Sequence, residues 1–276
     1  MNRGTRRVSF VFLSAFPFLD LVVFGLRPLR IPGVYQTIGG ALFAAIVVAA
    51  WILGASTLAS GAAAPRKIAL AGTLLIAPFA IMSLLWIGIG APFQATATEN
   101  YMRFLVLVAS SIIVASGFVV LKDVLCEAGE HFYSTIGFAA SVPAGVAYLF
   151  CTSMSAGQTI ASMQGHATST PAVLDDLYGV LELAACVLTY ITTAAFATSL
   201  AEARWLGRGV ARAYLVASAV LVSLLIMRGV EYPEISSNTE PWYTRPGVIA
   251  GIPAVPWTMA VLLGVVVLRR AGDARQ

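Results

Sequence analysis

The sequence predicts an all-α polytopic membrane protein of eight transmembrane helices, built as two tandem four-helix repeats in parallel orientation. Three observations lead to this prediction. The chain of 276 residues is 59% hydrophobic and only 11% charged, whereas a soluble domain carries roughly 25% charged residues. Long apolar segments recur along the whole chain. Several of its scarce polar residues recur in the same order in both halves.

Eight apolar segments are long enough to cross a bilayer, because a hydrocarbon core of about 30 Å needs about 20 helical residues. They do not alternate apolar and polar residues, as the strands of a membrane barrel do. Helices are expected, since each helix satisfies its own backbone hydrogen bonds in lipid. In order, the predicted spans are residues 8–26, 34–55, 68–90, 103–121, 132–153, 176–198, 210–228 and 247–268.

The first predicted span follows a basic start, as the core of a secretory signal does. It is long for such a core, contains Asp20, and ends in a basic, proline-containing stretch without a small-residue cleavage site. We therefore expect it to be retained as a helix. Pro17 leaves the carbonyl of Leu13 without its helical donor, so the sequence also predicts a kink in this helix.

The Lys and Arg residues predict the orientation of the spans, because cytoplasmic loops of membrane proteins carry an excess of both. With the N-terminus in the cytoplasm, 12 of the 17 basic residues fall on the cytoplasmic side. We therefore expect a protein of the cell (inner) membrane with both termini cytoplasmic. The 12 are Arg3, Arg6, Arg7, Arg66, Lys67, Lys122, Arg204, Arg208, Arg212, Arg269, Arg270 and Arg275, and the remaining 5 are Arg27, Arg30, Arg103, Arg228 and Arg245.

The two predicted repeats are residues 1–125 and 126–276. Their clearest shared feature is a polar phrase, Thr-Glu followed by Tyr-x-Arg, at residues 98–103 and again at 239–245. Four helices return the chain to its starting side, so both copies would have the same orientation. Chance similarity between apolar helices is the alternative. Each phrase either contributes a Glu–Arg pair to an outer entrance or anchors a helix start among the lipid headgroups.

The offset in residue number between matching residues of the two halves increases between the fifth and sixth spans. This increase predicts a loop inserted on the outer side of the second repeat, at about residues 153–170. This segment is rich in small and polar residues. Long insertions of this kind are often lids or binding loops. An ordinary surface loop is an equally good interpretation.

Two acidic residues lie deep within predicted spans, where a charge costs about 2.5–3.5 kcal/mol on insertion scales. Asp20 lies in the first span and Glu182 in the sixth, at similar expected depths below the outer surface. Arg228, at the outer end of the seventh span, is a candidate partner for Glu182, with an interfacial anchor as the alternative. Arg27 could instead neutralise Asp20, and a buried structural hydrogen bond is the alternative role for Glu182.

The fifth and sixth spans each carry a row of polar side chains at helical spacing, which should face a partner helix or a wet cavity. Packing between helices is the alternative explanation for the small and hydroxylic members. The row on the sixth span is Asp175, Tyr178, Glu182, Cys186, Thr189 and Thr193, and the row on the fifth is Ser134, Ser141, Tyr148 and Ser155.

No catalytic, metal-ligating or cofactor-binding motif stands out in the sequence, and no basic patch interleaved with aromatics points to nucleic acid. The leading functional hypothesis is a permease-like carrier of a small solute or ion, with an outer-facing polar cavity. Its proposed binding residues are Asp20, Tyr178, Glu182 and Arg228. A non-catalytic membrane subunit or sensor bound to another membrane protein is the first alternative, and a membrane-embedded enzyme at the outer leaflet is the second.

Overall fold

The computed structural model describes residues 3–25, 33–59, 62–89, 95–166, 171–229 and 248–274. Helices and short turns make up this part of the chain. In order, its helices are α1 (Arg3–Gly25), α2 (Val34–Leu53), the short 3-10 helix η1 (Ala55–Ala59), α3 (Ala63–Ile89), α4 (Ala97–Glu127), α5 (Phe132–Met163), α6 (Ala172–Glu202), α7 (Arg208–Arg228), α8 (Val248–Gly251) and α9 (Ala254–Asp273).

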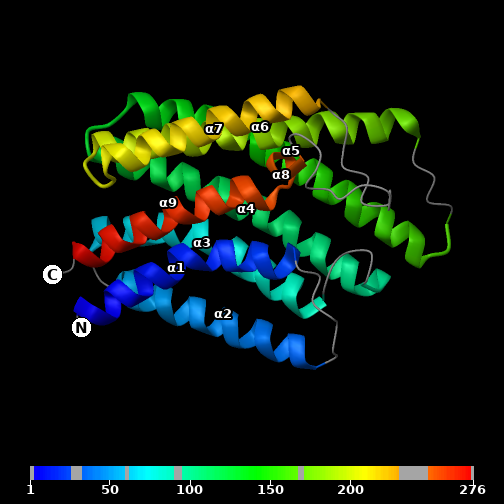
Figure 1. The fold of residues 1–276 in the computed structure, drawn as a ribbon, viewed down its shortest axis with the longest axis horizontal. Helices are drawn as coiled ribbons and strands as arrows, with labels where there is room; N and C mark the ends of the chain where they lie inside the picture. Colours follow the sequence, from blue (N-terminus) through cyan, green and yellow to red (C-terminus); the bar gives the residue numbers. More distant parts are fainter. Residues whose placement is uncertain are drawn as a thin grey trace.

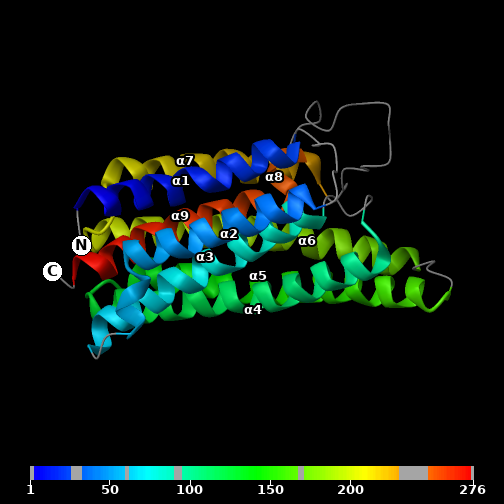
Figure 2. The same cartoon turned by 90° about the horizontal axis from the view of Figure 1, so that it is seen from below.

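The long helices lie side by side in one elongated bundle, in which α1 begins and α9 ends at the same end (Figures 1 and 2). Most neighbours in sequence are also neighbours in space, from α1 and α2 to α6 and α7. The exception is α9, which returns to the middle of the bundle and packs against α3, α6 and α1. The last helix therefore joins elements from both ends of the chain.

The described helices have the length and composition of a polytopic membrane protein. Seven of them, α2 to α7 and α9, contain a segment long and apolar enough to cross a membrane. Large apolar side chains lie exposed on their outer faces, among them Val216, Val220 and Ile226 of α7. In water such a surface would be unfavourable, whereas lipid tails solvate it. The bilayer is therefore the environment of this fold.

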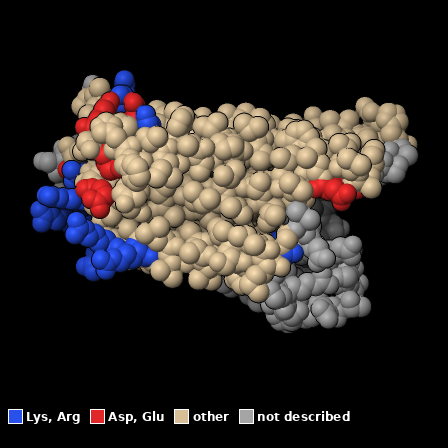
Figure 3. Space-filling model, turned by 90° about the horizontal axis from the view of Figure 1, so that it is seen from above, with Lys and Arg blue, Asp and Glu red and all other residues tan. Residues whose placement is uncertain are grey.

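Charged side chains gather at the two ends of the bundle and leave an uncharged belt between them (Figure 3). Most of the basic side chains visible on this face lie at the end where α1 begins and α9 ends. At this end Lys67 of α3 contacts two carboxylates of α4, Asp123 at 3.4 Å and Glu127 at 2.5 Å. A belt of this kind is what a bilayer core requires, since charge within it is costly.

Glycines allow α3 and α9 to pack closely at the centre. A Cβ atom on Gly72 of α3 would lie only 2.9 Å from the carbonyl oxygen of Gly264 on α9. In turn, a Cβ on Gly264 would lie 3.0 Å from the carbonyl oxygen of Gly72. Membrane helices use small residues in this way to bring their backbones into contact and gain dispersion energy.

The structure corrects the predicted boundaries at two places. The predicted span 247–268 is interrupted at Ile252 and Pro253, where α8 stops and α9 starts, because proline lacks the amide hydrogen that a continuous helix needs. Residues 153–163 of the predicted outer loop continue α5 as helix. Ser155 and Thr159 donate hydrogen bonds to carbonyls one turn earlier, so these hydroxyls do not end the helix.

The packing of the two halves differs in one respect. The predicted duplication pairs α3 with α7. In the structure α3 packs against α4 and α9 in the middle of the bundle, whereas α7 packs mainly against α6 and α8 and is mostly exposed. The duplication and the division at residue 125 therefore stay predictions from the sequence.

Candidate functional site

A small pocket opens between α6, α7 and α8, away from the end where the chain begins. It encloses about 230 Å³ of empty space, part of which is open to solvent. Only a small part of that space is wide enough for solvent, with room for about one water molecule. The residues that line it are Gly179, Glu182, Leu183, Cys186, Leu225, Arg228, Gly229 and Gly251.

Glu182 is the acidic residue of this pocket and is only 6% exposed. It lies on the inward face of α6, together with Cys186, Thr189 and Thr193, all of which are buried. The predicted polar row of the sixth span therefore turns into the bundle from Glu182 onward, while Asp175 at its outer end is exposed. A carboxylate this deep in an apolar bundle needs nearby polar groups to offset its desolvation.

Arg228 brings a positive charge to the same pocket from α7. It is the last residue of that helix, and Gly229 follows with a φ of 69°, a left-handed conformation that favours glycine. A Cβ atom on Gly251 would lie 1.8 Å from Nη1 of Arg228, so the absence of a side chain there makes room for the guanidinium. Two charged residues that sequence analysis singled out thus line one pocket.

Two hydrogen bonds hold α8 against α6 and so fix the wall of the pocket. The hydroxyl of Tyr190 donates to the carbonyl oxygen of Ala250 at 2.9 Å. The thiol of Cys186 donates to the carbonyl oxygen of Gly251 at 3.7 Å. Because α8 has only four residues, these contacts from α6 determine where Gly251 lies relative to Arg228.

Tyr178, the third predicted site residue, lies one turn before Glu182 and is half-buried. Its surroundings are on α5 rather than in the pocket. The thiol of Cys151 donates to its carbonyl oxygen at 3.8 Å. Tyr178 therefore flanks the site and joins α6 to α5.

Asp20, the fourth predicted site residue, belongs to α1, but its side chain lies outside the described part of the structure. The helix that carries it packs against α2, α3 and α9, whereas α6 packs against α5, α7 and α9. A role for Asp20 in the same site as Glu182 stays a prediction. The kink at Pro17 is also untested, although Pro17 does lie inside α1.

A second cavity lies deeper in the bundle, between α4, α5, α6 and α9, and sequence analysis did not find it. It encloses about 300 Å³ of empty space, part of which is open to solvent, and only a small part is wide enough for a water molecule. The row of serines and a tyrosine on α5 pointed to this cavity in part, because two of its residues, Ser141 and Tyr148, line it. The polar or aromatic lining residues are Ser111, Phe118, Ser141, Tyr148, Thr189, Thr192 and Trp257.

Most hydroxyls of the two polar rows are satisfied within their own helices. Thr189 donates to the carbonyl of Ala185 at 2.7 Å, and Ser141 donates to the carbonyl of Phe138 at 2.9 Å. Such back-bonding supports the interpretation that these residues serve helix packing. It also leaves their oxygen lone pairs free to accept further hydrogen bonds.

The first copy of the polar phrase starts a helix. Thr96 precedes α4 and accepts the N–H of Glu99 at 3.3 Å, while the Glu99 carboxylate accepts the N–H of Thr96 at 2.8 Å. This reciprocal pair is a capping box. Arg103 is fully buried beside Asn100, whose side-chain oxygen accepts a hydrogen bond from Nη1 at 2.9 Å. The second copy lies outside the described residues.

The described residues contain no group of three or more His, Cys, Asp and Glu side chains placed to hold a metal ion. Comparison with protein-family models, curated proteins and solved structures finds no match to this chain. The case for function therefore depends on the chemistry of the pocket that Glu182 and Arg228 line.

Proposed function

We propose that this integral membrane protein is a permease-like carrier whose solute site is the pocket between α6, α7 and α8. The observation that carries the proposal is that buried Glu182 and Arg228 line the same small pocket. Charged residues within membrane helices are rare, and those that line cavities commonly mark a substrate or ion path.

The two charges define the class of solute that would fit. Glu182 would coordinate a metal cation or accept hydrogen bonds from an amino group, and Arg228 would bind a carboxylate or another anionic group through its planar guanidinium. Gly179, Gly229 and Gly251 supply walls without side chains, where a solute approaches backbone groups closely. A small zwitterion, or a small cation held by Glu182 alone, meets these conditions best.

The space inside the pocket indicates which state of the carrier this would be. Room for about one water molecule is too little for an organic solute. The structure would then correspond to a closed state, and solute entry would require α7 and α8 to move away from α6. Carriers commonly bind substrate near broken helices, and the interruption between α8 and α9 lies beside this pocket.

The position of the α6 polar row favours a carrier over a subunit that uses this row to bind another protein. Cys186, Thr189 and Thr193 are buried inside the chain's own bundle, where they contact α5, α8 and α9. A row that recruits a partner would have to face outward. This packing is still compatible with a partner protein that docks on other faces of the bundle.

Ligand-induced stabilisation tests the proposal, because a solute that binds only the folded protein raises its melting temperature. The purified protein in detergent would be screened against small amino acids, amines, carboxylates and alkali cations. Solutes that stabilise it would then be tested for uptake into vesicles. We expect Glu182→Gln and Arg228→Lys to stay folded and to lose both effects.

Asp175→Asn is the matched control, since it removes a carboxylate from an exposed position on the same helix. It should leave binding and uptake unchanged. The proposal is wrong if a solute is bound and transported equally well by Glu182→Gln. It is also wrong if no class in the panel stabilises the wild-type protein.

We also propose that the end of the bundle where α1 begins and α9 ends faces the cytoplasm. The excess of Lys and Arg at that end supports this orientation. Single cysteines at Gln164 and Gly207, introduced after replacement of all three native cysteines, mark opposite ends. In intact cells an impermeant maleimide should label Gln164→Cys and not Gly207→Cys, and the reverse pattern would overturn the orientation.

A further inference from the structure

One face of α9 is only partly covered by the rest of the bundle. Within residues 256–268 every residue of this helix is buried except three, Met259, Leu262 and Val266. They are spaced three and four residues apart, so they share one face of the helix. Arg269, three residues after Val266, is exposed and continues the same face. These four residues are called the α9 strip below.

Two neighbouring helices border the α9 strip, and α9 runs between them (Figure 1). On the side of α7, the hydroxyl of Tyr214 donates to the carbonyl oxygen of Met259 at 3.1 Å. On the side of α1, the guanidinium of Arg269 lies over the ring of Phe10, 4.9 Å from its centroid. Because α1 packs against α2, α3 and α9, and α7 packs mainly against α6 and α8, these two helices do not close over the strip.

The α9 strip has the length of one leaflet of a bilayer. Met259 and Arg269 are ten residues apart in sequence, which is about 15 Å along a helix. Half of a hydrocarbon core of about 30 Å has the same depth. Since α9 ends at the charged end of the bundle (Figure 3), the strip runs inward from Arg269 to the contact between Met259 and Tyr214. An acyl chain whose headgroup lies beside Arg269 would fit along this length.

Three arginines gather at the charged end of the α9 strip. Arg3 and Arg7 are exposed on α1 and lie four residues apart. Phe10 follows Arg7 by three residues, so both arginines share the helix face whose phenylalanine contacts Arg269. In the part of the chain that the structure describes, no carboxylate forms an ion pair with Arg3, Arg7 or Arg269. These three residues are called the arginine cluster below.

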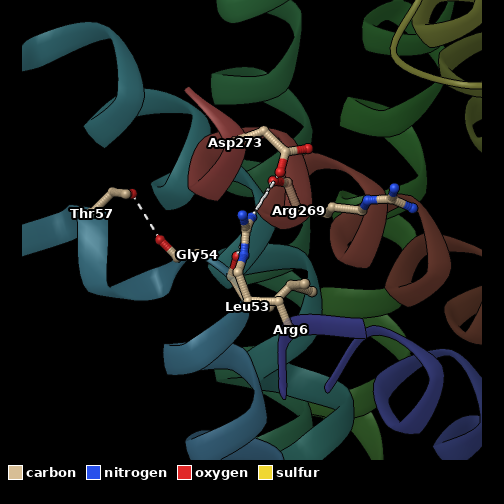
Figure 4. A network of polar contacts seen from close by, with 6 residues as sticks. All are labelled: Arg6, Leu53, Gly54, Thr57, Arg269 and Asp273. Atoms are coloured by element: carbon tan, nitrogen blue, oxygen red, sulfur yellow. Dashed lines mark hydrogen bonds and ion pairs between the residues drawn. The ribbon is translucent and has the colours of Figure 1, made fainter. Parts of the chain in front are cut away.

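The acidic residue on the next turn of α9 does not neutralise the arginine cluster. Asp273 forms its ion pair with Arg6, at 3.0 Å. Figure 4 shows the side chain of Arg269 extending away from that pair. The positive charge of the cluster is therefore available to an anionic group from outside the chain.

We propose that the α9 strip and the arginine cluster form a binding site for one anionic phospholipid. Guanidinium groups bind phosphate through paired, charge-assisted hydrogen bonds, and basic groups beside membrane helices attract anionic headgroups. An acyl chain would pack on Met259, Leu262 and Val266. The cluster would repel the ammonium of a zwitterionic headgroup, so the site should prefer phosphatidylglycerol to phosphatidylcholine. It is separate from the pocket of Glu182 and does not depend on the proposed carrier function.

Lipid titration followed by native mass spectrometry tests the site. Delipidated full-length protein in mild detergent would be titrated with phosphatidylglycerol or with phosphatidylcholine of the same acyl chains. We expect one phosphatidylglycerol molecule to bind in preference. Replacing two members of the cluster together, by Arg7→Gln and Arg269→Gln, should weaken its binding about 25-fold, because each arginine near an anionic headgroup contributes about fivefold.

The double variant Arg208→Gln with Arg212→Gln is the matched control, since it removes the same charge from exposed positions at the same end of the bundle. Arg212 and Tyr214 are two residues apart on α7, which places them about 200° apart around the helix. Arg208 shares the face of Arg212. Both arginines therefore point away from the α9 strip, and the control should bind phosphatidylglycerol as the wild type does.

Val266→Trp tests the acyl-chain part of the site, because an indole ring would fill the strip beside the intact arginine cluster. It should abolish the preference for phosphatidylglycerol. Val216→Trp, at an exposed position on α7 two residues after Tyr214, should leave the preference intact. Thermal unfolding checks that each variant is folded, and Leu262→Trp replaces Val266→Trp if the latter is not. Glycerol phosphate, which has the charged group without acyl chains, should not displace the lipid.

The site is wrong if phosphatidylcholine binds as tightly as phosphatidylglycerol. It is also wrong if the two double variants weaken binding equally, because the attraction would then belong to the whole basic end of the bundle. Binding that survives both tryptophan substitutions in the strip, or that glycerol phosphate competes away, would overturn the role of the acyl chain and with it the proposal. None of these outcomes affects the carrier proposal, whose test concerns Glu182 and Arg228.

Discussion

The Nη2 atom of Arg6 lies 3.0 Å from the Oδ1 atom of Asp273, so an ion pair joins the first helix to the last (Figure 4). The same nitrogen donates to the carbonyl oxygens of Leu53 and Arg269, each at 3.2 Å. Arg6 is buried, and these contacts bring α1, the end of α2 and α9 to one point. The contacts of Arg6 therefore hold the central helix α9 against α1.

Removing the Arg6 side chain should lower the stability of the fold more than neutralising its acidic partner, Asp273. Arg6→Ala loses an ion pair and two carbonyl contacts, which should destabilise the protein by about 2–3 kcal/mol. Asp273→Asn should cost about 1 kcal/mol or less, because the Asp273 side chain is 49% exposed. Thermal unfolding in detergent measures both, with Arg3→Ala as the exposed control on α1. Equal losses for Arg6→Ala and Arg3→Ala would contradict a structural role for Arg6.

The contact between Gly72 and Gly264 predicts strong intolerance of side chains. Gly72→Ala or Gly264→Ala would push α3 and α9 apart, at a cost of about 1–3 kcal/mol for overpacking. Gly40 of α2 is the control, since a Cβ atom there would have nothing within 4 Å. Gly40→Ala should be neutral or stabilising by up to about 1 kcal/mol, because alanine favours helix. A melting temperature unchanged by Gly264→Ala would show that this helix crossing is looser than described.

Glu130 provides a cap and a link between helices at the end of the bundle where α4 passes into α5. Its carboxylate accepts the N–H of Tyr133 at 2.8 Å and the N–H of Ser134 at 3.0 Å. The hydroxyl of Ser199 on α6 also donates to it. Burial raises the pKa of Glu130, but the hydrogen bonds from Ser199, Tyr133 and Ser134 outweigh burial and hold this pKa below its ordinary value of 4.5.

A lowered pKa means that ionised Glu130 stabilises the fold. The stabilisation should be fully present above the ordinary value of 4.5 and be lost as the pH falls through the lower pKa of the folded state. Glu130→Gln should cost about 1 kcal/mol at pH 7, as loss of a helix cap does. The difference in melting temperature between wild type and Glu130→Gln should shrink below pH 4.5. Glu202→Gln, an exposed change near the end of α6, is the control, and a difference that persists at low pH would refute the assignment.

Gly251→Ala should displace Arg228 from the pocket without unfolding the protein. The added Cβ would occupy the place of Nη1, at 1.8 Å, and a guanidinium at the end of a flexible side chain can move away. Arg228 should then react faster with phenylglyoxal, measured for this residue by mass spectrometry. Gly157→Ala, where a Cβ would meet nothing within 4 Å, should leave the rate unchanged. An unaltered rate in Gly251→Ala would mean that Arg228 does not depend on the space beside this glycine.

Sequence patterns predicted the helices well and their ends less well. Each of the eight apolar segments overlaps a helix, because hydropathy and length are local properties of the chain, but the last is divided between α8 and α9. Among the described helices, seven are long and apolar enough to cross a membrane, and α1 is not one of them. The extension of α5 to Met163 was missed because polar residues suggested a loop, although hydroxyls that bond back to their own helix are compatible with it. The Thr96–Glu99 capping box was also readable from the sequence, but Glu99 was interpreted only as part of the repeated phrase at residues 98–103.

By itself, the sequence determined that this protein is embedded in lipid, that it is helical, and that an acidic residue, Glu182, lies deep within a span. These follow from composition and periodicity alone. Only the tertiary structure decided that Glu182 and Arg228 share a pocket, that Tyr148 bonds Cys186, and that α9 lies against α3. The order and rotation of helices in a bundle depend on packing between surfaces far apart in sequence, such as Gly72 against Gly264, and apolar composition is nearly the same for every arrangement.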